Sequence, residues 1–264
     1  MKKIIIPIII LLCTILEINE NYFARQRVNS MKEENSILQQ KILINKWKKY
    51  TKRGDRTIYP NLKIFVSYDK PYTLWQHPFL TPIHVGRAIK QNDWLEKNMI
   101  GDNTGDNISI MNKKFGEMTI VYWTWKHYNE IGNPPYIGFF QHNKFIDLDV
   151  TNDAINHDMV VAEKIKVTLK NFNYVKRVIK KTHPEILNFI KQGESYANSN
   201  TNIMKKEIFF EYCEWIFPIL FEMEKEIEGD NDDFTPIIET LNGVFFDKKI
   251  KDEANVKTTI IINN

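Results

Sequence analysis

The chain has 264 residues, of which 43% are hydrophobic and 26% are charged, and its formal net charge is +3. This composition is that of a globular protein rather than a disordered one, and the small net charge excludes nucleic acid as an expected partner. The two cysteines are far apart and form neither a disulfide framework nor a zinc motif, which favours a reducing compartment.

The N-terminus carries an apolar run from Ile4 to Leu16, preceded by Lys2 and Lys3. The run is short for a spanning helix, and no cleavage site of small residues follows it. An uncleaved membrane anchor, a signal peptide and a buried strand all stay open, because periodicity does not separate short apolar runs. We favour a membrane-leaning segment over residues 1–18. It would place the protein at the cytoplasmic face of the cell membrane, with a cytoplasmic protein as the alternative.

Residues 19–58 are predicted to form a helical stalk or a packing helix. A ragged apolar stripe runs through residues 23–52 among Lys, Glu and Gln, and the segment ends in basic residues that would suit an anionic lipid surface. Gly54 and Pro60 then break the helical pattern. The sequence therefore predicts a boundary near Tyr59, followed by one domain over residues 59–264.

Strand and helix signals alternate beyond this boundary. Residues 62–68 and 136–140 read as buried strands, and helices are predicted over 83–97, 117–128, 175–190 and 205–228. Such alternation predicts an α/β domain with a largely parallel sheet. Because ligands bind beyond the carboxyl ends of parallel strands, the loops after Tyr68 and Phe140 are the places where a site is expected.

A loop rich in small polar residues, GDNTGDNIS, spans Gly101 to Ser109. Glycine and side chains that cap their own backbone are ordinary in surface turns. The same residue types can also hold a sugar, a phosphate or a metal ion, because their oxygens accept hydrogen bonds and glycine lets backbone N–H groups approach closely. We expect the loop to face the crevice at the ends of the two predicted strands, close to Lys70, His84 and His142.

Several segments, in the right order, resemble a known bacterial family. They are KIFVSYDKPY, TPIHVGRAI, IGDNTGDNIS, NPPYIGFFQH and IMKKEIFFEYCEWIFPIL. Together they look like the family called domain of unknown function 4422, whose members are usually assigned as glycosyltransferases of capsular and exopolysaccharide loci. The resemblance implies a nucleotide-diphospho-sugar transferase-like (GT-A-like) fold. It also implies sugar transfer from a nucleotide-sugar donor to a glycan or lipid-linked glycan acceptor.

One segment departs from the family's pattern. Where the family typically reads His-Tyr-Arg-Arg-Tyr-Phe, this chain reads QHNKFI, so Asn143 and Lys144 replace an arginine pair. The planar fork of arginine binds a diphosphate in a bidentate way, whereas lysine is a point charge. A second hypothesis is therefore a catalytically reduced family member that binds a sugar nucleotide or glycan, or scaffolds a polysaccharide assembly complex.

Sugar transfer needs a base for the acceptor hydroxyl and cationic groups for the departing diphosphate. The resemblance and the expected crevice suggest Asp102, Asp106 and His142 as catalytic groups. Asp147 and Asp149, one residue apart, could hold Mg²⁺ or Mn²⁺, although this pattern is common by chance. Turn capping is the ordinary alternative for the aspartates, and packing is the alternative for His84. The expected substrate-binding residues are Lys70, His84, Arg87, Thr104, Asn107, Gln141 and Lys144.

Overall fold

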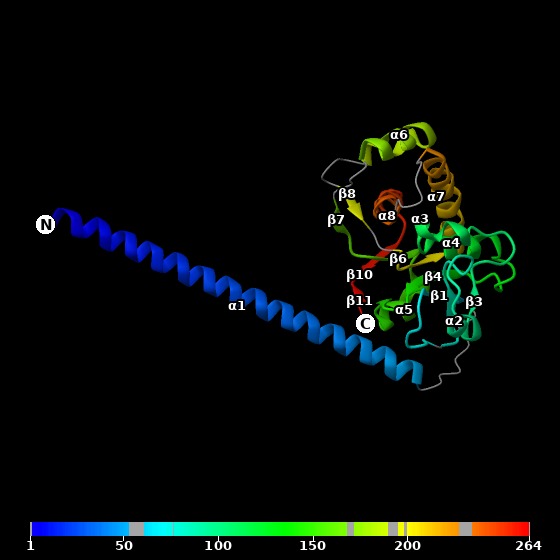
Figure 1. Ribbon diagram of the computed structural model, residues 1–264, viewed down its shortest axis with the longest axis horizontal. Helices are drawn as coiled ribbons and strands as arrows, with labels where there is room; N and C mark the ends of the chain where they lie inside the picture. The colour runs from blue at the N-terminus through cyan, green and yellow to red at the C-terminus, as the bar shows by residue number, and fades with distance from the viewer. Residues whose placement is uncertain are drawn as a thin grey trace.

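The computed structural model describes residues 2–52, 61–75, 77–167, 172–189, 195–197, 200–226 and 234–263. Its centre is a sheet in the order β10-β6-β9-β4-β1-β2-β3, in which β5 also pairs with β4, and β11 pairs with β5 (Figure 1). The strands of this sheet are β1 (Leu62–Tyr68), β2 (Leu80–His84), β3 (Ile100–Gly101), β4 (Tyr136–Gln141), β5 (Lys144–Ile146), β6 (Met159–Ala162), β9 (Asn202–Lys205), β10 (Val256–Thr259) and β11 (Ile261–Asn263). A separate small ladder pairs β7 (Ile165–Val167) with β8 (Ser195–Ala197).

The helices surround this sheet. They are α1 (Lys2–Lys52), α2 (Asp93–Asn98), α3 (Asn112–Phe115), α4 (Met118–Lys126), α5 (Leu148–Asp153), α6 (Phe172–Thr182), α7 (Lys206–Glu226) and α8 (Thr235–Lys251). The 3₁₀ helices are η1 (Ser109–Met111), η2 (Ala154–Asn156) and η3 (Pro184–Phe189).

The two strands predicted from sequence are neighbours in the sheet, as expected. β1 and β4 run parallel, with Leu62 opposite Tyr136. Nearly every residue of both strands is buried, which explains why their sequences read as continuous apolar runs rather than as alternating ones. The sheet is mixed rather than wholly parallel, because β9 runs antiparallel to both β4 and β6. The carboxyl ends of β1, β2, β4 and β6 therefore share one edge with the start of β9.

Two hydrophobic cores lie on the two faces of the sheet. One core joins β1 and β4 to α4, α7 and α8 through residues such as Phe65, Ile137 and Phe217. The other joins the same strands to the end of α1 through residues such as Ile64, Phe140 and Trp47. Burying both faces leaves the strand ends as the place where polar side chains gather.

Some of the helix predictions need correction. Residues 83–97 do not form one helix. They comprise the end of β2, a turn, and the short helix α2, which Asn92 caps by accepting from the backbone N–H groups of Trp94 and Leu95. Gly86 in the turn has a φ of +66°, which a helix does not allow. The helix predicted over 175–190 ends at Thr182 as α6. A separate 3₁₀ helix, η3, begins at Pro184, and residue 190 lies outside the described ranges. The helices predicted over 117–128 and 205–228 are confirmed within narrower bounds, as α4 (Met118–Lys126) and α7 (Lys206–Glu226), and residues 227 and 228 lie outside the described ranges.

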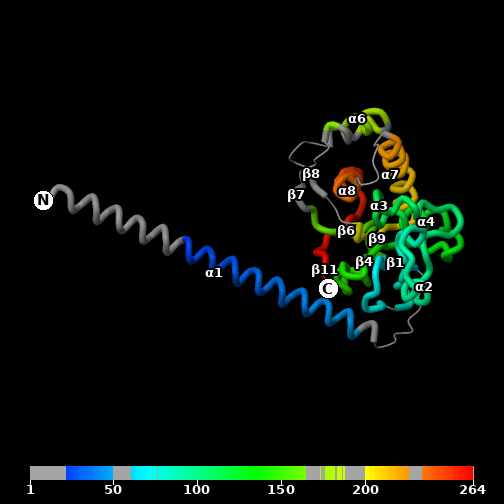
Figure 2. Tube along the Cα trace, in the orientation of Figure 1, coloured from blue at the N-terminus to red at the C-terminus, as the bar shows by residue number. Residues whose placement is uncertain are grey.

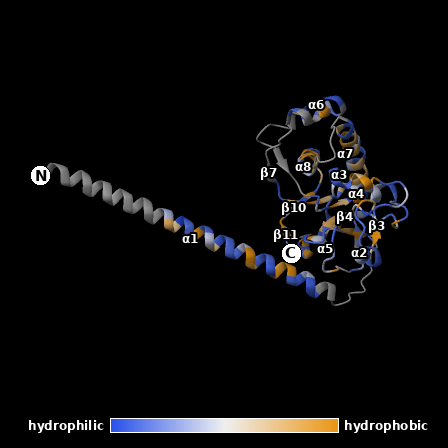
Figure 3. Cartoon of the chain, in the orientation of Figure 1, coloured by the Kyte–Doolittle hydropathy of each residue, from blue (hydrophilic) through white to orange (hydrophobic). Residues whose placement is uncertain are grey.

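Helix α1 serves as both a stalk and a packing helix. Near its end, Ile44 and Trp47 are buried, and the Trp47 indole donates to the backbone oxygen of Ile146 at 3.0 Å. Gln40 is bonded to the backbone of β11. Toward the N-terminus of α1, residues 22–38 extend away from the domain, and their side chains are exposed (Figure 2). Blue and orange alternate along this part of α1 in Figure 3, so its exposed surface mixes polar and apolar residues.

Residues 4–16 are helical, which rules out the strand alternative. Their side chains lie outside the described part of the chain, and the predicted membrane association stays a prediction. Among the described residues, no helix has the length and apolar character needed to cross a membrane. The boundary predicted near Tyr59 also lies outside the described residues.

Candidate functional site

The candidate site lies at the shared edge where β1, β2 and β4 end. Tyr68 is opposite His84 in the register of β1 and β2, and Ser67 is opposite Gln141 in that of β1 and β4. The backbone N–H of His142 donates to the oxygen of Ser67 at 3.0 Å, which holds the residue after β4 against the end of β1. Strand pairing therefore places His142, Tyr68 and His84 next to one another at the ends of β4, β1 and β2.

His142 is the most suitable proton acceptor of these three residues. Its Nδ1 lies 3.8 Å from Oδ1 of Asp69, and its ring packs against Tyr68 and Tyr72. Burial lowers the pKa of His142 below its usual value, although the Asp69 carboxylate opposes this effect. The imidazole is therefore neutral at pH 7. Its Nε2 has no hydrogen-bond partner among the described residues, so it remains available to a substrate.

Two lysines expected to bind substrate lie near His142. Lys70 is exposed and follows Asp69 directly, close enough to His142 to help lower its pKa. Lys144 begins β5 and is opposite Gln141 in the hairpin that follows β4. Neither lysine forms an ion pair within the ranges that the structure describes. Both ammonium groups are therefore free to meet an anionic group at this edge.

His84 is placed differently from the sequence expectation. Its side chain is fully buried, and neither ring nitrogen has a hydrogen-bond partner among the described residues. Burial lowers the pKa of His84, while the nearby Asp102 carboxylate raises it by a smaller amount. Because the ring is closed off from the surface, its geometry fits a neutral packing residue at the end of β2.

Asp102 was expected to act as a base or metal ligand, but it is enclosed. The side chain is fully buried, and its two oxygens accept from the backbone N–H groups of Gly86 and Arg87 at 2.8 and 3.1 Å. The hydroxyls of Ser109 and Thr119 also donate to it. With four donors around it, the carboxylate joins the turn after β2, the loop after β3 and helix α4. Its contacts support a structural role.

The rest of the GDNTGDNIS loop lies against α4. Thr104 accepts a hydrogen bond from the Trp123 indole at 2.9 Å, and Asp106 accepts one from the Tyr122 hydroxyl at 3.0 Å. Asn107 bonds within the loop, to the Gly105 oxygen and the Ser109 N–H. These contacts, within the loop and to α4, are those of an ordinary surface turn rather than of a loop that binds a ligand.

The loop follows β3, which is separated in the sheet from β4 and therefore from His142. β1 and β2 separate β3 from β4 in the sheet, which is about 14 Å at the usual spacing of strands. The loop adjoins His84, because the Asp102 N–H donates to the His84 oxygen at 3.2 Å. Arg87, another expected substrate-binding residue, instead lies 3.6 Å from the carboxylate of Glu96.

Asp147 and Asp149 have contacts that do not fit a metal site. Asp147 caps α5 by accepting from the backbone N–H groups of Asp149 and Val150. Asp149 is largely exposed and forms an ion pair with Lys46 of α1. β5 turns back from the end of β4 and pairs with β11, so the two aspartates are carried away from the shared strand edge. Within the described residues, no group of three potential ligands could hold a metal ion.

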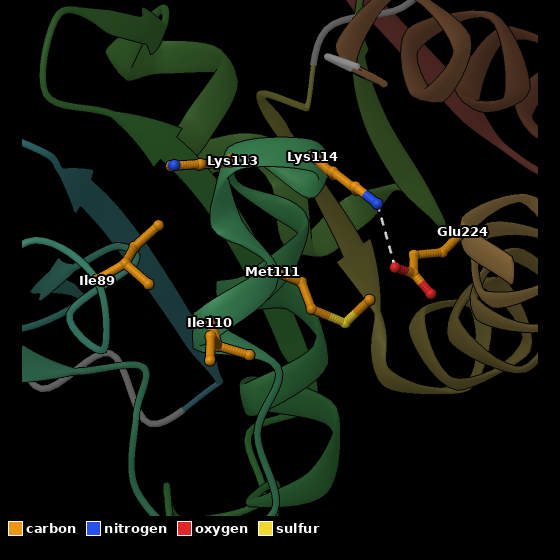
Figure 4. Close-up of a pocket in the computed structure, with 6 residues that line it drawn as sticks. All are labelled: Ile89, Ile110, Met111, Lys113, Lys114 and Glu224. Atoms are coloured by element: carbon orange, nitrogen blue, oxygen red, sulfur yellow. Dashed lines mark hydrogen bonds and ion pairs between the residues drawn. The ribbon is translucent and has the colours of Figure 1, made fainter. Parts of the chain in front are cut away.

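A cavity of about 290 Å³ opens elsewhere, in front of η1 and α3. Figure 4 shows Lys114 directed to Glu224, an ion pair of 3.2 Å, while Ile110 and Met111 lie below them in the view. None of the residues expected from sequence lines this cavity. We therefore place the candidate site at the strand edge, where titratable groups converge, and not in this larger cavity.

The family can now be assigned. A family model described as "Domain of unknown function (DUF4422)" matches residues 63–235. This chain belongs to that family. No match was found among curated protein sequences.

A solved structure described as the apo form of the bifunctional glycosyltransferase WbbM is similar to this DUF4422 member, with a TM-score of 0.66 and 23% sequence identity. The match covers 76% of this chain and 45% of that chain, so this protein spans less than half of the length of WbbM. The likeness concerns the fold, which is α/β, as the sequence pattern predicted, and of the GT-A-like type, as the family resemblance implied.

Sequence reasoning missed several residues at the strand edge of this DUF4422 domain. Asp69 directly follows β1, and its position at a strand end is a signal that would have identified it. Ser67 and Asn200 line a small hollow beside Gln141, together with Glu117 at the start of α4. Asn200 gave no local signal, because only the pairing of β9 with β4 brings it to this edge.

Proposed function

We propose that this protein is a glycosyltransferase that moves a sugar from a nucleotide-sugar donor to a glycan acceptor. The observation that carries the proposal is the pairing of His142 with Asp69 at the edge of a GT-A-like sheet, with Lys70 and Lys144 beside them. Family membership and the fold shared with WbbM support it. A neutral imidazole next to a carboxylate is suited to general base catalysis.

Each group has a defined part in the proposed transfer. Nε2 of His142 takes the proton of the acceptor hydroxyl, whose oxygen forms a bond to the anomeric carbon of the donor sugar. The bond between that carbon and the diphosphate oxygen breaks, and the nucleoside diphosphate leaves. Asp69 stabilises the imidazolium that forms, and the ammonium groups of Lys70 and Lys144 offset the charge on the leaving diphosphate.

The proposed transfer needs only the side chains named above and does not depend on Mg²⁺ or Mn²⁺. The contacts of Asp147 and Asp149 do not fit the role of ligands, since one caps a helix and the other pairs with a lysine. The assays below are nevertheless run with and without Mn²⁺, so that dependence on the metal is measured.

We further propose that the reaction belongs to surface polysaccharide biosynthesis, at the cytoplasmic face of the membrane. The resemblance to glycosyltransferases of capsular and exopolysaccharide loci supports this role. The apolar run after Lys2 and Lys3 supports the location and a lipid-linked acceptor. Comparing the full chain with one that begins at Asn29 in membrane fractions tests the location. Equal solubility of the two would count against it.

The experiment that tests transfer measures nucleoside diphosphate release from a panel of nucleotide sugars, with glycan acceptors present. We expect release from at least one donor, and a loss of about 100-fold or more in His142→Gln, the usual range for a general base. His157→Gln is the matched control, because His157 pairs with Asp153 away from the strand edge. Equal activity of the two variants would remove His142 from the mechanism.

A second candidate function is sugar-nucleotide or glycan binding without transfer, including a scaffolding role. The observation that favours it is the replacement of the family's arginine pair by Asn143 and Lys144, because a lysine holds a diphosphate less specifically. Binding of a nucleotide sugar without release of diphosphate, for every donor and acceptor tried, would support this candidate over the first.

A further inference from the structure

A small hollow opens at the shared strand edge, on the opposite face of the sheet from His142. It lies where β1, β4 and the start of β9 are side by side (Figure 2). Its volume is about 10 Å³, which is room for one water-sized group. Phe65, Phe139 and Ile120 form part of its lining, and its polar residues are Ser67, Glu117, Gln141 and Asn200.

Two of the polar side chains in this hollow are buried and still have hydrogen-bonding capacity. Ser67 is 5% exposed and Asn200 is 7% exposed. Among the described residues, the Ser67 hydroxyl and the Asn200 Nδ2 have no hydrogen-bond partner. Neither atom is among the fully buried polar atoms that lack a partner, so both are open to the hollow and can bond to a ligand or a water there.

A chain of buried hydrogen bonds orients the Asn200 amide. The Tyr212 hydroxyl donates to Oδ1 of Asn242 at 2.6 Å, and Nδ2 of Asn242 donates to Oδ1 of Asn200 at 2.7 Å. Because the oxygen of Asn200 is engaged, its Nδ2 is the atom left to donate to a ligand. The Ser67 hydroxyl can either donate or accept. The hollow therefore offers a fixed donor beside an adaptable partner.

The charge of the lining restricts the ligand further. It contains no lysine, arginine or histidine, and its one charged residue is the acidic Glu117. A phosphate would be repelled here, whereas a neutral hydroxyl would bond to Ser67 and Asn200.

We propose that Ser67 and Asn200 form a socket for one hydroxyl group of a neutral sugar, whose ring lies over the mouth of the hollow. The strand edge would then bind the two parts of a donor at different places. Lys70 and Lys144 would bind the anionic diphosphate, and the hollow would bind a hydroxyl group of the uncharged sugar. As a sugar subsite of the transferase, the socket rests on the proposed function. As a binding site for sugar hydroxyls, it stands on the contacts above.

The test follows the Asn200 side-chain amide by NMR in the ¹⁵N-labelled full chain, with its signal assigned by its loss in Asn200→Ser. The probes are the methyl glycosides of glucose, galactose, mannose and N-acetylglucosamine, with inorganic phosphate as the anionic probe. We expect at least one glycoside to shift the signal and phosphate to leave it unchanged. Failure of every glycoside up to its solubility limit, or an equal shift with phosphate, would overturn the socket.

Two variants separate binding from folding. Ser67→Ala removes one of the two partners and is expected to weaken the glycoside by about fivefold, the effect of one ordinary hydrogen bond. The matched control is Thr124→Val, because Thr124 is also buried and its hydroxyl also has no partner among the described residues, but it does not line the hollow. Equal weakening in both variants would contradict the socket.

The outcomes also separate this inference from the proposed function. If diphosphate release depends on His142 but no glycoside shifts Asn200, the socket fails and the transferase stands. If a glycoside shifts Asn200 but no nucleotide sugar is bound or cleaved, the transferase fails and the socket stands as a glycan-binding site.

Discussion

Oδ1 of Asp69 lies 3.8 Å from Nδ1 of His142, although the two residues follow different strands. The contact exists because β1 and β4 pair in parallel, so the residue after each strand reaches the same edge. Neither residue is held in place by its local sequence. The proposed chemistry therefore depends on the contacts that maintain the sheet and the elements packed on it.

Asp102→Ala is expected to destabilise the protein by about 3 kcal/mol or more, because it leaves four buried donors without their acceptor. Asp106→Ala is the control, since Asp106 is exposed and bonded only to the Tyr122 hydroxyl in the described part of the chain. It should cost about 0.5 kcal/mol or less. Urea unfolding measures both, and similar midpoints for the two variants would show that Asp102 is not a structural centre.

Gly105→Ala is expected to be more destabilising than Gly132→Ala. Both glycines have a positive φ, at +54° and +95°, so both variants carry backbone strain of roughly 1 kcal/mol. A Cβ at Gly105 would lie 2.3 Å from Nε2 of His127, whereas nothing lies within 4 Å of one at Gly132. The clash should add about 1 kcal/mol or more. Thermal unfolding of the two variants gives the difference, and a smaller loss at Gly105 would mean that the loop does not pack on α4 as described.

The free energy of unfolding is expected to fall as the pH drops below 6.5. Burial lowers the pKa of His84 in the folded protein below its ordinary value of 6.5, so the unfolded chain binds protons more readily in this range. The stability is complete above pH 6.5 and is lost progressively toward the lower folded pKa. Denaturation midpoints between pH 7.5 and 5 measure the slope. His84→Leu should flatten it, and an unchanged slope would exclude His84 as a contributor.

Trp47→Ala is expected to cost about 3–5 kcal/mol, because the indole is fully buried among Phe79, Phe140 and Phe145. Leu38→Ala is the control on the same helix, where the side chain is 57% exposed. It should change stability by about 0.5 kcal/mol or less. Comparable losses from both would indicate that the exposed part of α1 is covered by a partner in solution.

The strands β1 and β4 and the helices α4 and α7 were predictable because their apolar patterns are long or continuous. β2 was not, since Ile83 and Val85 flank a histidine in a short run that suits either a helix or a strand, and only pairing with β1 decides between them. The GDNTGDNIS composition correctly indicated a loop. Whether Asp102 faces substrate or interior depends on α4 and the turn at Gly86, which are distant in sequence.

The candidate site was predictable only in part, for the same reason. His142, Lys70 and Lys144 were proposed from sequence because they follow strands or lie in the hairpin after one. Asn200 was missed because a long excursion of the chain separates β4 from β9, and the antiparallel return of β9 has no local signal. The role of Asp149 was also hidden, since its partner Lys46 belongs to α1.

The central claim is that the edge formed by β1 and β4 binds a nucleotide sugar through Lys70, Lys144 and His142. The most direct measurement is a calorimetric titration of the full chain with a panel of nucleotide sugars, with and without Mn²⁺, repeated for the double variant Lys70→Ala with Lys144→Ala and for Asp147→Ala. The account predicts binding of at least one nucleotide sugar, weakened at least tenfold by the double lysine variant, which corresponds to about 1.4 kcal/mol, and unchanged by Asp147→Ala. Binding that Asp147→Ala abolishes while the lysine variant leaves it intact would contradict the account, as would the absence of binding across the panel.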